Sequence, residues 1–295
     1  MRYDILIFIV GVLLISGCTG PAPETHVGGV DIGFLLNQPP IELREDASFV
    51  VGLKLTNNIP KPVNGELCIS DTPANSFGGI QEPDCRHFMI AAAEVVDDKK
   101  YVENQNVYFP SEGSSYSYHN LEFGIGSTNI NAKLKYDLST TSLAEICLKK
   151  DPAEEISGCE SNSVIFGNDI VSDFAPIVIE KIESSIVPEG NQNRVHLKIT
   201  LKKEPLGSVT FNDIENKLKM DINLAGTATS FTCYPSQEGL IKFNELTKVV
   251  NCDSSVDLGG QDFYVDSLIM NLDYTYTISA STGAIPLKRK SEDTY

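Results

Sequence analysis

The chain of 295 residues contains no tryptophan and four histidines, and it lacks the short motifs that mark common catalytic sites. There is no G-x-S-x-G elbow, S-x-x-K, H-E-x-x-H, phosphate-binding G-x-x-x-x-G-K or EF-hand loop. No C-x-x-C occurs and the histidines are not grouped with cysteines, which argues against a zinc site. These absences favour a binding or structural protein, without cofactor or metal, over an enzyme.

Positive charge is also scarce, since 23 lysines and arginines face 40 aspartates and glutamates, for a net charge of −17. Such a balance repels nucleic-acid phosphates and argues against a nucleic-acid partner. With 41% hydrophobic residues the chain can bury real cores. Its length suits two domains of ordinary size.

Long apolar runs are absent except for one of about a dozen residues, 5–15, which follows Arg2. It is too short to cross a bilayer core of roughly 30 Å as a helix but has the length of a signal-peptide core. The run ends in Ser16-Gly17-Cys18. Small residues before a cysteine resemble a lipoprotein lipobox, and Cys18-Thr19-Gly20 resembles the starts of archaeal surface lipoproteins.

This resemblance implies a signal peptide over residues 1–17 and a lipid on Cys18. Residues 18–28, rich in proline and glycine, then form a flexible tether. The membrane becomes a partner through the anchor, and the expected location is the outer face of the cytoplasmic membrane. The alternative is ordinary secretion with a free thiol at Cys18.

The cysteine count agrees with export. If Cys18 of the seven cysteines carries lipid, an even number of six remains, as in disulfide-bonded exported proteins. Six cysteines allow 15 pairings, but their order along the chain suggests local ones. The expected pairs are Cys68–Cys85, Cys147–Cys159 and Cys233–Cys252. Closing each loop would stabilise the fold by about 3 kcal/mol in the chain-entropy model.

An internal repeat indicates two units, because three blocks recur in the same order. The first block is a strand-like alternation at 51–56 and again at 195–200. The second is the cysteine spacing, 68…85 and 233…252. The third is Leu134-x-Tyr136 followed by Ile146-x-Leu148, which matches Leu272-x-Tyr274 followed by Ile285-x-Leu287. The units expected from these matches span residues 28–168 and 172–290.

Each unit offers about seven short strands separated by turn signals, which predicts an all-β fold of two tandem immunoglobulin-like antiparallel β-sandwiches. The segments Gln38-Pro39-Pro40 and 44–48, ahead of the 51–56 strand, resemble the opening of cell-adhesion-related domains of bacteria and archaea. The resemblance covers roughly residues 30–70 and, more weakly, 177–210. It implies a fold type and no catalytic residues. If residues 172–290 are a complete sandwich, they should fold alone.

One segment, 101–119, combines aromatic residues with serine, glycine and asparagine, as antibody combining sites do. Its aromatic residues are Tyr101, Tyr108, Phe109, Tyr116 and Tyr118. They form a possible recognition surface, although alternation along 116–119 also suits packing on a sheet. Asp253 and Asp257 offer carboxylates for calcium, without the spacing of a calcium loop. His196 lies between apolar neighbours on its strand and is expected to face solvent.

Three classes of function remain from the sequence. The first is a structural, adhesion or protein-interaction module of the cell surface, with other surface proteins or envelope components as partners. The alternative is a solute- or glycan-binding lipoprotein that presents its ligand to a membrane partner. A hydrolase with an unrecognised site is the third class. A deep pocket with converging polar groups would favour ligand binding, whereas flat sandwich faces would favour protein contacts.

Overall fold

A computed structural model describes residues 28–290, apart from 74–76, 97–98, 122–125, 161, 173–174, 191, 228 and 238. This part of the chain is almost entirely antiparallel β-structure, interrupted by a short 3-10 helix, η2 (Gly167–Asp169). The all-β prediction is therefore confirmed. No helix in these ranges has the length and apolarity that a membrane crossing requires. The expected signal peptide, Cys18 and the tether up to residue 27 lie outside the described residues.

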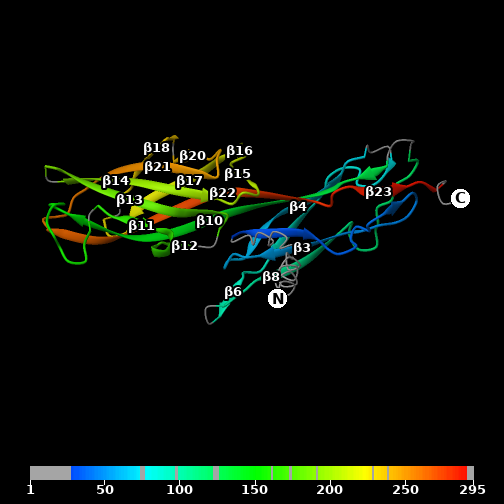
Figure 1. The fold of residues 1–295 in the computed structure, drawn as a ribbon, viewed down its shortest axis with the longest axis horizontal. Helices are drawn as coiled ribbons and strands as arrows, with labels where there is room; N and C mark the ends of the chain where they lie inside the picture. Colours follow the sequence, from blue (N-terminus) through cyan, green and yellow to red (C-terminus); the bar gives the residue numbers. More distant parts are fainter. Residues whose placement is uncertain are drawn as a thin grey trace, which may run out of the picture.

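Two long strands, β10 (Ile130–Lys149) and β22 (Phe263–Ser281), run through the whole molecule (Figure 1). They pair antiparallel from Asn131 opposite Ser281 to Lys149 opposite Phe263. Even-numbered side chains of both strands are buried along nearly their full length. Because side chains alternate between the two faces of a strand, one face of this ribbon is core from end to end.

The ribbon is the centre of a long sheet with the order β5-β4-β10-β22-β17-β20-β19. Next to β10, β4 pairs with residues 130–136; next to β22, β17 pairs with residues 268–273. These contacts lie in different halves of the ribbon. The bounds are β4 (Val63–Asp71), β5 (Asp84–Ile90), β17 (Lys217–Leu224), β19 (Ser236–Gln237) and β20 (Leu240–Lys242). Short strands β12 (Val171–Ser172), β15 (Ser208–Phe211) and β16 (Ile214–Glu215) extend its edges.

Two smaller sheets pack on the buried face of the ribbon and create two sandwiches. The first sandwich is covered by β1 (Val30–Phe34), β3 (Val51–Asn57) and β8 (Glu103–Phe109), in the order β1-β3-β8. The second is covered by β11 (Val164–Phe166), β13 (Ile177–Glu189), β14 (Gln192–Lys203), β21 (Thr247–Val256) and β18 (Thr232–Tyr234), in the order β11-β13-β14-β21-β18. In Figure 1 the second sandwich forms the left lobe.

The remaining strands belong to the first sandwich. The C-terminal strand β23 (Ile285–Lys288) lies between β2 (Leu43–Arg44) and β9 (Ser127–Thr128). A two-stranded hairpin, β6 (Glu94–Val96) and β7 (Lys99–Tyr101), projects from the body. The last strand of the chain therefore completes the domain that contains the first strand.

This topology corrects the expected division into units 28–168 and 172–290. The second half of β10 is a strand of the second sandwich, and the second half of β22 with β23 returns to the first. Each sandwich is thus built from both parts of the chain. The physical reason is strand length: β10 and β22 are about twice as long as one sandwich, so each extends into the other's sheet.

The repeat itself is visible in the topology. Strands β3 and β14, the first matched block, are both central strands of the small sheets. In the third block, Leu134 and Tyr136 on β10 correspond to Leu272 and Tyr274 on β22. A pseudo-twofold axis near the Asp137–Thr275 pair exchanges them. The two ends of the third block, Ile146/Leu148 and Ile285/Leu287, are likewise both buried.

The second block is not equivalent. Cys68–Cys85 joins β4 and β5 in the long sheet, whereas Cys233–Cys252 joins β18 and β21 in a small sheet. The similar spacing along the sequence is therefore no sign of equivalent position, and this part of the repeat prediction is wrong.

Where the sandwiches meet, aromatic side chains make the core continuous. Tyr136 and Tyr276 face each other across the ribbon with ring centroids 5.9 Å apart, and Tyr274 is buried beside them. The backbone N–H of Val30 donates to the Tyr136 hydroxyl at 2.9 Å, and the Tyr276 hydroxyl donates to the carbonyl of Leu206. Buried apolar residues of both sandwiches form one cluster, which predicts cooperative folding.

Candidate functional site

The six cysteines of the described chain form the three expected pairs. Two of the pairs join residues directly opposite each other on adjacent strands: Cys68 with Cys85 and Cys233 with Cys252. The first is partly exposed and the second is buried. Such pairing is typical of an oxidising compartment.

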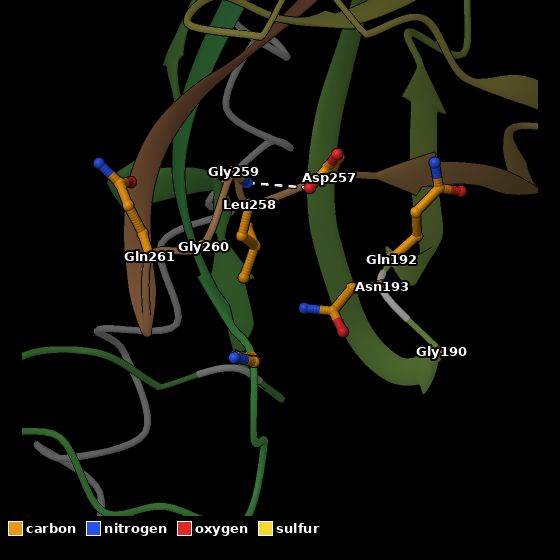
Figure 2. Close-up of a pocket in the computed structure, with 9 residues that line it drawn as sticks. Gly190, Gln192, Asn193, Asp257, Leu258, Gly259, Gly260 and Gln261 are labelled. Atoms are coloured by element: carbon orange, nitrogen blue, oxygen red, sulfur yellow. Dashed lines mark hydrogen bonds between the residues drawn. The ribbon is translucent and has the colours of Figure 1, made fainter.

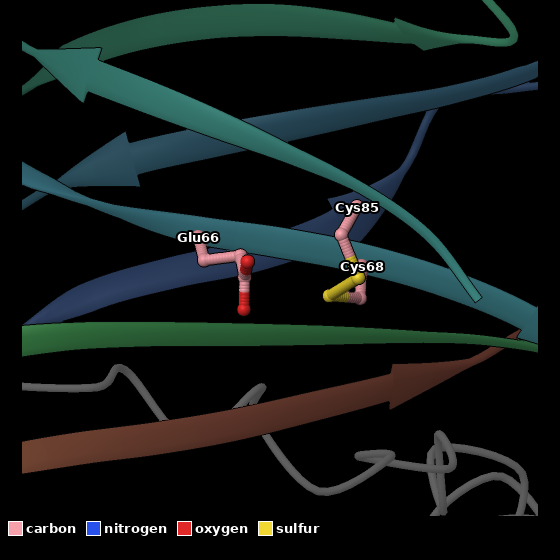
Figure 3. A group of neighbouring side chains, drawn as sticks. All are labelled: Glu66, Cys68 and Cys85. Carbon is pink, nitrogen blue, oxygen red and sulfur yellow. A yellow bond between two sulfur atoms is a disulfide. The ribbon is translucent and has the colours of Figure 1, made fainter.

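Glu66 lies next to the first of these disulfides and completes a group of metal-ligating residue types (Figure 3). The two sulfur atoms are bonded to each other, so neither Cys68 nor Cys85 offers a thiolate. A single carboxylate then remains, which is too little for a closed metal site.

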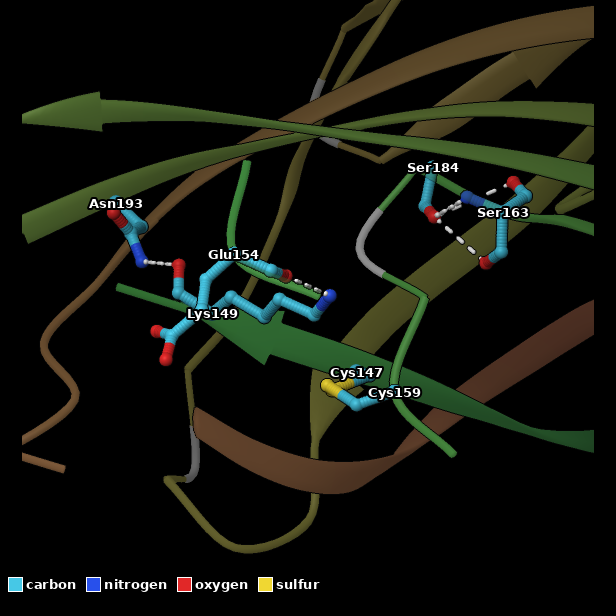
Figure 4. Close-up of a disulfide and its surroundings, with 7 residues drawn as sticks. All are labelled: Cys147, Lys149, Glu154, Cys159, Ser163, Ser184 and Asn193. Carbon is cyan, nitrogen blue, oxygen red and sulfur yellow. Dashed lines mark hydrogen bonds between the residues drawn. A yellow bond between two sulfur atoms is a disulfide. The ribbon is translucent and has the colours of Figure 1, made fainter. Parts of the chain in front are cut away.

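The third disulfide, Cys147–Cys159, ties the loop after β10 back onto that strand (Figure 4). Lys149 is almost fully buried there and donates from Nζ to the carbonyl of Glu154 at 2.8 Å. The Asn193 side chain in turn donates to the carbonyl of Lys149 at 2.6 Å. These bonds satisfy buried polar groups and indicate a structural role for the loop.

A pocket of about 360 Å³ lies at the end of the second sandwich, between residues 257–261 and the β13–β14 turn (Figure 2). Its lining is polar and glycine-rich, with Gln192, Asn193 and Asp257. The Asp257 carboxylate accepts the N–H of Gly259 at 2.9 Å, and the Asn193 amide is bonded to Lys149. None of the described residues that line it is aromatic, so none offers a ring on which a sugar could stack.

The two aspartates considered for calcium are not brought together. Asp253 lies on β21 and contacts the His196 ring nitrogen Nδ1, while Asp257 stabilises a turn beyond the end of the strand. His196 is half-exposed on the outer face of its sheet, as expected. His196 and Asp253 lie directly opposite each other on adjacent strands, so the histidine belongs to a cross-strand pair.

The tyrosine-rich segment is mostly packing. Phe109 and Tyr118 are fully buried, and the Tyr118 hydroxyl donates to Asp71 at 2.6 Å. Tyr116 is half-buried and donates to Asp84 at 2.6 Å. Desolvation, followed by the bond to Asp84, raises the pKa of Tyr116 far above its ordinary value. A recognition surface that includes all five aromatic residues is therefore wrong, because three of them serve the core.

Tyr101 and Tyr108 are exposed, by 56% and 47% of their surface. Tyr101 ends the projecting β6–β7 hairpin and Tyr108 lies on the edge strand β8. Their side chains come from separate strands, so any contact that they make is a small part of a larger surface.

Ser117, His119 and Asp46 have hydrogen bonds in the order of a catalytic triad. Ser117 Oγ lies 2.9 Å from His119 Nε2, and His119 Nδ1 lies 3.0 Å from Asp46 Oδ1. The histidine and aspartate side chains are about half exposed, and Asp46 also accepts Lys290 Nζ at 3.3 Å. His119 and, secondly, Lys290 lower the pKa of Asp46.

A triad acts in a water-excluded site with free backbone donors for the oxyanion. Here the nearby N–H groups of Gly79 and His119 already donate to the carbonyls of Ser117 and Phe77. We interpret these hydrogen bonds as structural contacts that hold the loop around Asp46 to the C-terminal residues near Lys290.

A cluster of exposed apolar side chains along one edge of the second sandwich escaped the sequence prediction. Leu143, Val164, Phe166 and Val171 are exposed by 41, 49, 57 and 72%. They come from β10, β11 and β12, and we call them the β11–β12 patch. The consecutive apolar residues Val164-Ile165-Phe166 are the only sequence signal for it, and such a run equally suits a buried strand.

No protein family model matches the chain, and no curated protein does.

Proposed function

We propose that the protein is a lipid-anchored module on the outer face of the cytoplasmic membrane that binds other surface proteins or envelope components, without enzymatic activity. The resemblance to cell-adhesion-related domains is part of the same proposal.

The cysteine pairing is the observation that carries the proposal. All six cysteines from residue 68 onward are used in disulfides, so Cys18 is left over from an otherwise complete set. Disulfides of this kind persist outside the reducing cytosol. A leftover cysteine directly behind an apolar run and Ser16-Gly17 is the residue that a lipid would take.

The shape of the molecule supports binding over catalysis. Two sandwiches on a shared ribbon make a long body with a continuous core, which can hold binding surfaces at a fixed spacing (Figure 1). In the polar pocket at the tip, the Asp257 carboxylate already accepts the N–H of Gly259 and the Asn193 amide already donates to the carbonyl of Lys149. Exposed edges and faces offer more area than this pocket for a partner.

The anchor is tested by expressing the full chain with Cys18→Ser in its native type of host, with Thr19→Ser as the matched control. We expect Cys18→Ser to be released from membranes or to remain unprocessed, while Thr19→Ser stays bound. Intact mass of the native protein should show a lipid on Cys18. An unmodified Cys18 thiol in the mature protein would reject the anchor.

Partners are tested by chemical cross-linking in native membranes followed by mass spectrometry. The proposal expects specific cross-links to surface proteins or envelope polymers, mapped to exposed strands. A protein that cross-links to nothing at its native abundance would contradict an interaction role.

The second candidate is glycan or solute binding in the tip pocket, which its polar lining favours. Gln192→Ala is the direct test, scored by binding to a panel of surface glycans. Wild-type binding that Gln192→Ala abolishes would favour this candidate over protein contacts.

A further inference from the structure

The β11–β12 patch combines apolar exposure with open strand edges. In the described chain β11 pairs with β13 alone, and β12 pairs with β10 alone. Two grooves run along the patch: one of about 460 Å³ includes Leu143, Val164 and Val171, and one of about 650 Å³ includes Phe166. Exposed side chains of this size, gathered in one place, usually mark a contact surface.

The described chain begins beside this patch. Gly28 lies so close to Ala175 that a Cβ on the glycine would come within 2.4 Å of the Ala175 carbonyl oxygen. Ala175 lines the same groove as Phe166, and it follows β12 closely in the chain. In Figure 1, β12 lies along the lower side of the second sandwich. Two residues after Gly28, the N–H of Val30 donates to Tyr136, where the two sandwiches meet.

Chain length then limits the distance between the patch and Cys18. Ten peptide steps separate Cys18 from Gly28. A fully extended segment of this length reaches about 35 Å, and a random coil of the same length spans roughly 16–19 Å on average. A lipid on Cys18 would therefore hold the junction between the two sandwiches near the bilayer, and not one of the two ends of the molecule.

We propose that the β11–β12 patch rests on the lipid bilayer, with its apolar side chains at the level of the head groups and the long axis of the protein along the membrane. This inference rests on the proposed lipid anchor. The tether keeps the patch at high local concentration near the lipid, so a few apolar side chains suffice to orient the body.

Charge specifies the kind of lipid surface. Glu145 and Asp169 border the smaller groove, two lysines and two glutamates balance each other in the larger one, and the chain has a net charge of −17. Contact with the bilayer is therefore apolar, and zwitterionic head groups suit it better than anionic ones. With the patch on the membrane, the strands on the opposite edge of the five-stranded sheet face outward.

The absence of tryptophan allows a direct test, because one introduced tryptophan is the sole reporter. The mature chain from Cys18, with its disulfides intact, is coupled through the Cys18 thiol to a maleimide lipid in phosphatidylcholine vesicles. Phe166→Trp reports on the patch. Tyr234→Trp is the matched control, since Tyr234 is 55% exposed on β18, the other edge strand of the same sheet.

We expect a blue shift and quenching by brominated lipid for Trp at 166, and neither change for Trp at 234. Adding Val171→Asp should reverse the shift at 166 while the circular dichroism spectrum stays unchanged. Replacing a third of the lipid by phosphatidylserine should reduce the blue shift and the quenching of Trp at 166.

Equal, solvent-like emission at both positions would overturn the proposal, whether or not a protein partner later covers the patch. Because the chemical tether replaces natural lipidation, this result leaves the anchor itself to the mass measurement on native Cys18.

Discussion

The first sandwich covers its part of the ribbon with three strands, whereas the second uses five. The first compensates by drawing β23 from the far end of the chain against β2 and β9. The second keeps its extra strands, β11 and β18, as edges of its small sheet, and one of these edges carries the apolar patch. The two similar sandwiches therefore complete their sheets differently. The first uses β23 from the C-terminal end of the chain, whereas the second uses β11 and β18, which lie near its other strands in the sequence.

The strands that cross between them make the two sandwiches depend on each other. The first lacks part of its long sheet without residues 275–288, which come from the end of the chain. Without β10, the second sandwich loses the strand that pairs with both β12 and β22. Neither sandwich is contained in one half of the sequence.

The largest effect should come from cutting the chain. Residues 172–290 alone should fail to fold, in contrast to the expectation from the repeat, because β22 loses β10 along its whole length. Residues 130–281, which retain β10, both sheets of the second sandwich and two disulfides, should unfold cooperatively. NMR spectra of both fragments, produced under oxidising conditions, decide the matter. A well-dispersed spectrum for 172–290 would restore two independent units.

A matched pair of core substitutions tests whether the sandwiches unfold together. Leu53→Ala on β3 and Leu197→Ala on β14 remove equivalent, fully buried side chains. Each should lower the unfolding free energy by about 2–5 kcal/mol. Because the core is continuous, each should shift a single calorimetric transition. Two transitions, of which each variant moves one, would show that the junction does not couple the sandwiches.

The cross-strand disulfides should differ in how fast they are reduced. Cys68–Cys85 is partly exposed, whereas Cys252 is fully buried and Cys233 nearly so. Mild dithiothreitol followed by alkylation and peptide mapping should label Cys68 and Cys85 first. Replacing either pair by alanine should cost about 3 kcal/mol, since the closed loops have similar lengths. Equal reduction rates would indicate that the second sandwich opens locally.

The smallest effect concerns pH and the first sandwich. Burial raises the pKa of Asp71 above its ordinary 3.8, and the bonds from Ile80 N–H and the Tyr118 hydroxyl offset part of this rise. The folded state thus holds the proton more tightly than the unfolded state. The stability from this group is present below the unfolded pKa and is lost as pH rises through the folded one.

Relative to Asp71→Asn, the wild type should therefore lose unfolding free energy as pH rises from about 3 to 6. Asp46→Asn is the control of opposite sign, since His119 and Lys290 lower the pKa of Asp46. There the wild type should lose its advantage as pH falls. Urea titrations across this pH range measure both differences, and parallel curves for wild type and Asp71→Asn would exclude a raised pKa for Asp71.

Local features of the sequence were sufficient for the all-β fold class and for the disulfide pairs. Alternation around Leu134 and Leu197 identifies side chains that are buried, because a strand's period of two sets which residues share a face. The cysteines pair across short loops, so their order in the chain predicts the partners. The charge and the missing motifs point away from nucleic acid and from known catalytic sites. None of these inferences requires a contact between distant segments.

Tertiary structure decided what periodicity leaves open. A period of two specifies the face of a strand but not its partner, so nothing local indicates that β10 pairs with β22 more than 100 residues away. The same uncertainty hid the burial of Phe109 and Tyr118 and the exposure of Phe166 and Val171. Whether an apolar side chain is core or surface depends on which sheet covers it, and that is settled only when the two long strands join the sandwiches.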